Sequence, residues 1–107
     1  MKKSLFLTGI LALASISIAY SKTYDVVFEH TTQAGTVQLK AGSYELKLDG
    51  DKAIFTDVNS YKQYTVPVKV ESAARKFSAT KVEESGSGNI DTLKYIQLGG
   101  STTQIDF

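Results

Sequence analysis

The sequence predicts an all-β protein: a small antiparallel β-sandwich or barrel of about seven to eight short strands after an N-terminal signal helix. Two observations carry this prediction. Apolar and polar residues alternate with a period of two along most of residues 22–107, whereas apolar residues at helical spacing are nearly absent there. Turns, most of them containing glycine, separate the alternating segments, and no gap between them is long enough for a crossover helix.

Residues 1–21 have the three parts of a secretory signal peptide. Lys2 and Lys3 make the start positive, residues 5–18 are largely apolar, and Ala-Tyr-Ser at 19–21 fits the small-x-small cleavage pattern. The alternative is a membrane anchor, but an apolar run of about fourteen residues is short of the roughly 20 that span hydrocarbon. We therefore expect a secreted or periplasmic protein in which residues 22–107 form a single domain.

The composition of that domain argues against some classes of binding partner. Loss of Lys2 and Lys3 with the signal changes the net charge from +1 to −1, and a near-neutral chain of this kind argues against nucleic acid and anionic membranes. The chain has no cysteine, so it forms no disulfides and carries no cysteine-linked lipid. We expect no stable membrane insertion of the mature domain, and hydrophobic burial alone must hold it together.

The alternation predicts strands at 23–30, 36–40 and 43–49 in the first part of the domain. Residues 31–35 are small and polar and are expected to form a turn. Segment 43–49 alternates most regularly, and its expected inward residues are Tyr44, Leu46 and Leu48.

A tight turn at Asp49-Gly50-Asp51 then predicts a hairpin between 43–49 and the next strand, 52–58.

The segment 63–72 is expected to be one strand at a sheet edge. Tyr64, Val66, Val68 and Val70 alternate with polar residues and are expected to share a face. Pro67 has no amide hydrogen, so the strand lies at an edge or carries a bulge there.

The remaining elements are less regular. Residues 73–76 are expected to form a helical turn, 78–84 a polar edge strand and 85–89 a flexible loop. Strands at 90–98 and 102–107 complete the domain.

One motif resembles a known family. The run Leu-Lys-Ala-Gly-Ser-Tyr-Glu-Leu-Lys-Leu at 39–48 is similar to a strand of prealbumin-like and carboxypeptidase-regulatory-like β-sandwich domains. The resemblance implies that Gly42 serves a turn and that Tyr44 enters the core. The signal, the single small β domain and the Leu-Gly-Gly at 98–100 also resemble a group of small secreted bacterial proteins. That likeness implies export and fold, and it implies no activity.

No arrangement of residues indicates catalysis or a metal site. His30 is the only histidine, and a metal site there would need carboxylates such as Asp25, Glu29 and Asp91 to converge on it. No Gly-x-Ser-x-Gly motif is present for a serine nucleophile, and Asp49 and Asp51 are explained by turn chemistry. We expect no enzyme activity, no metal and no cofactor, and we interpret His30 as a surface residue at a strand end.

Two surfaces remain as candidates for binding. The first is the edge strand, where Thr65, Pro67, Lys69 and Glu71 would meet a partner that completes its unpaired backbone. We therefore expect a non-enzymatic module that binds or supports another macromolecule at the cell envelope or outside the cell.

The alternative is a small-ligand or carbohydrate-binding module that uses Tyr61, Gln63 and Tyr64, because exposed aromatic rings stack on sugars and neighbouring amides bind their hydroxyls. A competing interpretation is that Tyr64 belongs to the valine face and Tyr61 only covers the rim of the hairpin. The partner, protein or glycan, is not specified by the sequence.

Overall fold

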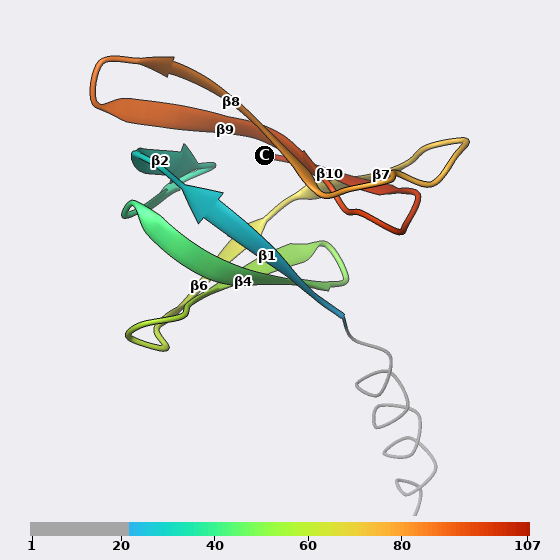
Figure 1. Ribbon diagram of the computed structural model, residues 1–107, viewed down its shortest axis with the longest axis horizontal. Coiled ribbons are helices and arrows are strands. Elements are labelled where there is room, and N and C mark those ends of the chain that lie inside the picture. The colour runs from blue at the N-terminus through green and yellow to red at the C-terminus, as the bar shows by residue number, and fades with distance from the viewer. Residues whose placement is uncertain (1–21) are drawn as a thin grey trace, which may run out of the picture.

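The computed structural model describes residues 22–107, which contain ten strands and no helix. The expected signal peptide at 1–21 lies outside these described residues. Figure 1 shows two layers of strands, which confirms the predicted all-β sandwich. The chain crosses between the layers several times, and this is why ten short strands form where fewer and longer ones were expected.

The first sheet has four antiparallel strands in the order β1-β4-β5-β6. Their bounds are β1 (Thr23–Phe28), β4 (Gly42–Asp49), β5 (Lys52–Asp57) and β6 (Gln63–Pro67). The predicted hairpin between β4 and β5 is confirmed, with Asp49 opposite Lys52 across a turn in which Gly50 has a φ of 64°. Gly42 at the start of β4 has a φ of 147°, which favours glycine at this turn.

The second sheet has six strands and is centred on β9 (Ile90–Gln97). β8 (Lys81–Ser87) pairs along one side of β9, and β2 and β10 share its other side, β2 near the start of β9 and β10 near its end. The outer neighbours are β3 beside β2 and β7 beside β10. The bounds of these four strands are β2 (Thr31–Ala34), β3 (Val37–Leu39), β7 (Lys69–Ser72) and β10 (Thr103–Asp106).

The expectation of a turn at 31–35 was wrong, because residues Thr31–Ala34 form β2 and pair in parallel with β9. Thr32 and Ala34 are fully buried, so the inward side chains of this strand are small rather than large. Within the helical turn expected at 73–76, Ala74 and Arg75 form a bend instead. β8 extends to Ser87 and leaves only Gly88 and Asn89 in the predicted loop at 85–89.

The core lies between the two sheets and is rich in aromatic residues. Phe28, Tyr44 and Phe55 pack with ring centroids 5.6 to 6.3 Å apart, and Tyr64 and Phe107 pack against this group. The Tyr44 hydroxyl donates a hydrogen bond of 2.7 Å to the Lys40 carbonyl, which satisfies the polar end of a buried ring. The buried apolar residues are Val26, Phe28, Ala34, Leu39, Tyr44, Leu46, Ala53, Phe55, Val66, Leu93, Ile96, Leu98 and Ile105.

Candidate edge-strand binding site

The predicted edge strand is two strands that belong to different sheets. β6 pairs with β5 in the first sheet, and after Val68 the chain continues as β7, which pairs with β10 in the second sheet. The expectation that four alternate residues share one buried face is therefore wrong at its end. Val66 is fully buried and Tyr64 and Val68 are half-buried, but 44% of Val70 is exposed. The sequence alternates across the crossing, but only β6 buries its alternate residues, and all four residues of β7 are exposed.

β6 is the last strand of its sheet, since β5 is its one hydrogen-bonded neighbour among residues 22–107. Two bonds at the ends of the β5–β6 ladder show which backbone groups are free. The Asp57 amide donates to the Lys62 carbonyl (2.9 Å), and the Val68 amide donates to the Asp51 carbonyl (2.9 Å). Bonded and non-bonded residues alternate along an antiparallel strand, so Tyr64 and Val66 also direct their backbone groups to β5.

Gln63, Thr65 and Pro67 therefore direct their backbone groups to the open side of β6. The edge offers the amides of Gln63 and Thr65 and the carbonyls of all three residues. Pro67 occupies a position whose amide would point to solvent, which is where an edge strand tolerates proline. The side chains of these three residues are exposed, on the outer face of the sheet.

Lys69 and Glu71 lie in β7, where they pair with Asp106 and Gln104 of β10. A hydrogen bond and charge repulsion from the nearby Asp106 carboxylate raise the pKa of Glu71. Hydrogen bonds from Glu71 and Gln104 lower the pKa of Asp106. The outer face of β7 thus carries interacting charges, whereas the exposed side chains of β6 are uncharged.

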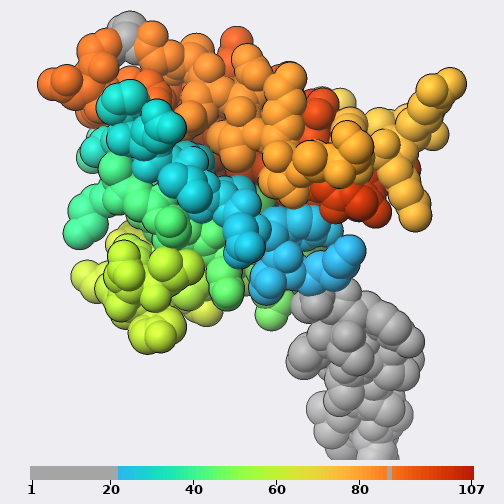
Figure 2. Space-filling model, viewed as in Figure 1, coloured from blue at the N-terminus to red at the C-terminus, as the bar shows by residue number. Residues whose placement is uncertain are grey.

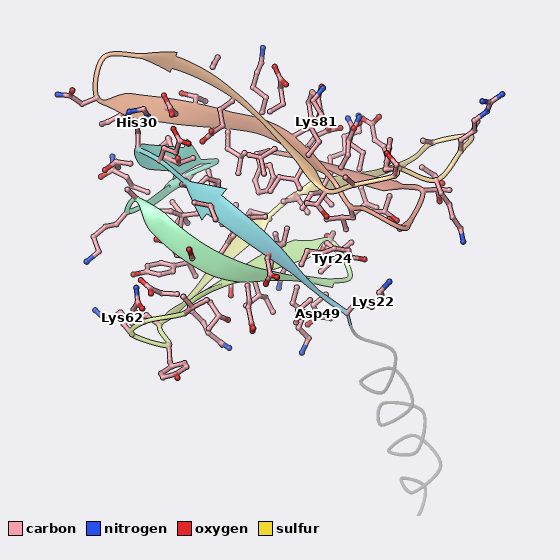
Figure 3. The ribbon with its side chains drawn as sticks, viewed as in Figure 1. Lys22, Tyr24, His30, Asp49, Lys62 and Lys81 are labelled. Atoms are coloured by element: carbon pink, nitrogen blue, oxygen red, sulfur yellow. The ribbon has the colours of Figure 1, made fainter. Side chains whose placement is uncertain are left out.

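The loop between β5 and β6 holds Tyr61 in an uncommon conformation. Its φ of 63° lies in the left-handed region, where it is the one non-glycine residue among those described, and 78% of it is exposed. The Asp57 carboxylate accepts hydrogen bonds from the Asn59 and Ser60 amides, which lower its pKa, and the Tyr61 amide donates to the Asp57 carbonyl (2.8 Å). Figure 2 shows this yellow-green loop projecting from the molecule, and Lys62 marks it in Figure 3.

The other two predicted ligand residues point in different directions. Tyr64 is half-buried, and its ring packs edge-on against Tyr44 at 6.4 Å. Gln63 is exposed opposite Thr56 on the outer face of the sheet. Tyr61 thus offers an exposed ring on the rim, while Tyr64 contributes to the core.

Three comparisons, with protein-family models, curated proteins and solved structures, found no match.

A second polar cluster, which the sequence did not reveal, surrounds His30. Figure 3 shows His30 where the chain leaves β1 and enters β2, and its Nδ1 lies 3.2 Å from Asp91 Oδ2 of β9. The Asp91 carboxylate fills the space that a Cβ at Gly86 would occupy, so a side chain there would displace the carboxylate from His30. The buried Thr32 hydroxyl lies 3.0 Å from Glu84 Oε2 and 2.9 Å from the His30 carbonyl oxygen. No sequence pattern indicated this cluster, because residues 85–89 were expected to form a loop rather than part of β8.

The His30 cluster offers few groups that could bind a metal ion or carry out a reaction. The His30 side chain is 58% exposed and the Asp91 side chain 18% exposed, so the pair links the β1–β2 corner to β9 at the surface. In the part of the chain that the structure describes, no three His, Asp or Glu side chains are placed to hold a metal ion. No helix within 22–107 is long and apolar enough to cross a membrane.

Proposed function

We propose that this protein is an exported, non-enzymatic β-sandwich module that binds another macromolecule, at the cell envelope or outside the cell, along the edge of β6. The partner is a protein that adds an extended strand to β6. Export is proposed from the features of residues 1–21.

The observation that carries the proposal is the row of unpaired backbone groups on β6. Two amides and three carbonyls of Gln63, Thr65 and Pro67 face away from β5, and the exposed side chains beside them carry no charge. Proteins commonly protect exposed edges with charged side chains, because an open edge is a template for another strand. Pro67 has no amide hydrogen, so the edge offers one donor fewer but can still pair with another strand.

The test is capture of a partner by immobilised protein containing residues 22–107, which include all ten strands and the whole core. Thr65→Pro removes an outward amide, whereas the matched control Thr65→Val keeps the amide and changes only the side chain. We expect the proline variant to lose the captured protein and the valine variant to retain it. Circular dichroism is the control for the folding of both variants. Equal capture by both would exclude this edge.

A second candidate function is sugar binding at Tyr61. It is favoured by the strained left-handed backbone, which holds an almost fully exposed ring on a loop fixed by Asp57. Gln63 supplies an amide on the neighbouring strand.

The chain has no tryptophan, so tyrosine fluorescence can follow titration with soluble N-acetylglucosamine oligomers. Binding that is lost in Tyr61→Ala and retained in Tyr61→Phe would support this function. An unchanged signal at saturating sugar would contradict it.

A further inference from the structure

Among the open edges of this sandwich, β6 differs in its lack of charge. β1 carries Asp25, β7 carries Lys69 and Glu71, and β8 carries both lysine and glutamate. β3 is uncharged but only three residues long. β6, with the sequence Gln-Tyr-Thr-Val-Pro, is the longest uncharged edge strand within residues 22–107, and none of its five residues would repel an identical strand.

We propose that the strand added to β6 is β6 of a second copy of this chain, antiparallel to the first about a two-fold axis at Thr65. This inference rests on the proposed function and names its partner. The two four-stranded sheets would join into one continuous sheet of eight strands. Such an interface is isologous, so it forms a closed dimer and not a fibre.

The outward backbone groups define this register. With Thr65 opposite the partner's Thr65, the two residues exchange two hydrogen bonds through amides and carbonyls that both face the open side. Gln63 then lies opposite the partner's Pro67, and its amide donates to that proline carbonyl. Two-fold symmetry repeats this bond, so four backbone hydrogen bonds form.

Pro67 selects against a neighbouring register. If the strands shifted so that Thr65 faced the partner's Pro67, the proline would have no amide for the Thr65 carbonyl, and only two bonds would remain. A shift the other way places Gln63 opposite the partner's Thr65 and also forms four hydrogen bonds, but it leaves the Pro67 carbonyl unpaired. Pro67 then lies opposite the partner's Tyr61, where the chain is no longer extended and the amide is already bonded to Asp57. The register with Thr65 on the axis uses all three outward residues of β6.

The side chains fit the same arrangement. Two threonines meet on the axis, on the outer face of the sheet, where cross-strand Thr–Thr pairs are favourable. Four hydrogen bonds and this threonine contact form a weak dimer, so we expect association to depend on concentration.

The experiment uses the chain 22–107 in analytical ultracentrifugation, from about 10 µM to about 1 mM, a range in which weak association is measurable. We expect a monomer–dimer equilibrium for the native sequence and for Thr65→Val. Thr65→Lys and Thr65→Glu each place like charges on the two-fold axis and should each weaken dimerisation by about tenfold or more. An equal mixture of these two variants should dimerise again, because opposite charges then meet on the axis.

Recovery in the mixture shows that the two copies of residue 65 lie next to each other across the interface, as they do about a two-fold axis at Thr65. A native chain that stays monomeric over the whole range would overturn the inference, and so would a mixture that dimerises no better than its components. Circular dichroism and thermal melts confirm that each variant is folded. If the native chain is monomeric while Thr65→Pro still abolishes capture of another protein, this inference fails and the proposed function stands.

Discussion

Proline at two adjacent positions of β6 tests the backbone directions on which the binding edge depends. Thr65 directs its amide to the open side, whereas Val66 directs its amide to Ala53 of β5. Thr65→Pro therefore removes a solvated donor from an exposed residue and should cost at most about 1 kcal/mol of unfolding free energy.

Val66→Pro should be far more costly. It breaks one ladder hydrogen bond, worth about 0.5–1.5 kcal/mol, and leaves the Ala53 carbonyl unsatisfied in a fully buried position, at about 1–3 kcal/mol. The Val66 side chain is itself fully buried and packs beside Gly35, whose added Cβ would lie 3.3 Å from Val66 Cγ1, so its loss adds to the cost.

We expect a total of about 3–5 kcal/mol for Val66→Pro. Urea denaturation of both variants, followed by circular dichroism, measures the difference. A larger effect at Thr65 would show that the backbone directions along β6 are reversed, and equal destabilisation would contradict the difference between the two positions.

Three further predictions concern the core, the strained loop and the β7 surface. Leu46→Ala should destabilise the fold by about 2–5 kcal/mol because Leu46 is fully buried, whereas Lys47→Ala on the outer face should cost less than about 0.5 kcal/mol. Similar losses in denaturant melts of the two variants would show that the register described for β4 is wrong. Tyr61→Gly should be more stable than Tyr61→Ala by about 1 kcal/mol because glycine accepts the φ of 63°, and the reverse order in thermal melts would argue against a left-handed residue. The folded-state pKa of Glu71 is raised above the ordinary value of 4.5, so protonated Glu71 stabilises the fold at low pH and this stability is lost as the pH rises through that pKa. Glu71→Gln should thus be more stable than the native protein at neutral pH and show no advantage at pH values below that pKa. A stability difference that stayed constant across a pH series of melts would exclude the interaction with Asp106.

The sequence predicted the fold class and the strands whose large side chains alternate over a buried face. Segment 43–49 is the clearest case, because Tyr44 and Leu46 are buried and Lys47 is on the opposite face. The strand Thr31–Ala34 was missed because its inward residues are small and its environment depends on β9, which lies about 60 residues further along the chain. Parallel pairing of this kind leaves no local turn signal.

At the candidate site, too, the sequence predicted local properties and missed those that depend on distant parts of the chain. Pro67 correctly indicated an edge or a bulge, since the absence of an amide is a local property of the residue. The crossing at Val68 is not visible in the sequence, because side-chain alternation continues when a chain changes sheet. The left-handed Tyr61 and the contact between His30 and Asp91 depend on tertiary structure and have no periodic signature.

Amide hydrogen exchange along β6 tests the account most directly. In dilute protein, the amides of Gln63 and Thr65 should exchange rapidly, whereas those of Tyr64 and Val66, bonded to β5, should be strongly protected. When a partner strand occupies the edge, whether a second copy or another protein, Gln63 and Thr65 should become protected while the other two amides change little. Protection of Gln63 and Thr65 in dilute monomer, or their continued rapid exchange in a saturated complex, would contradict the claim that β6 is the binding edge.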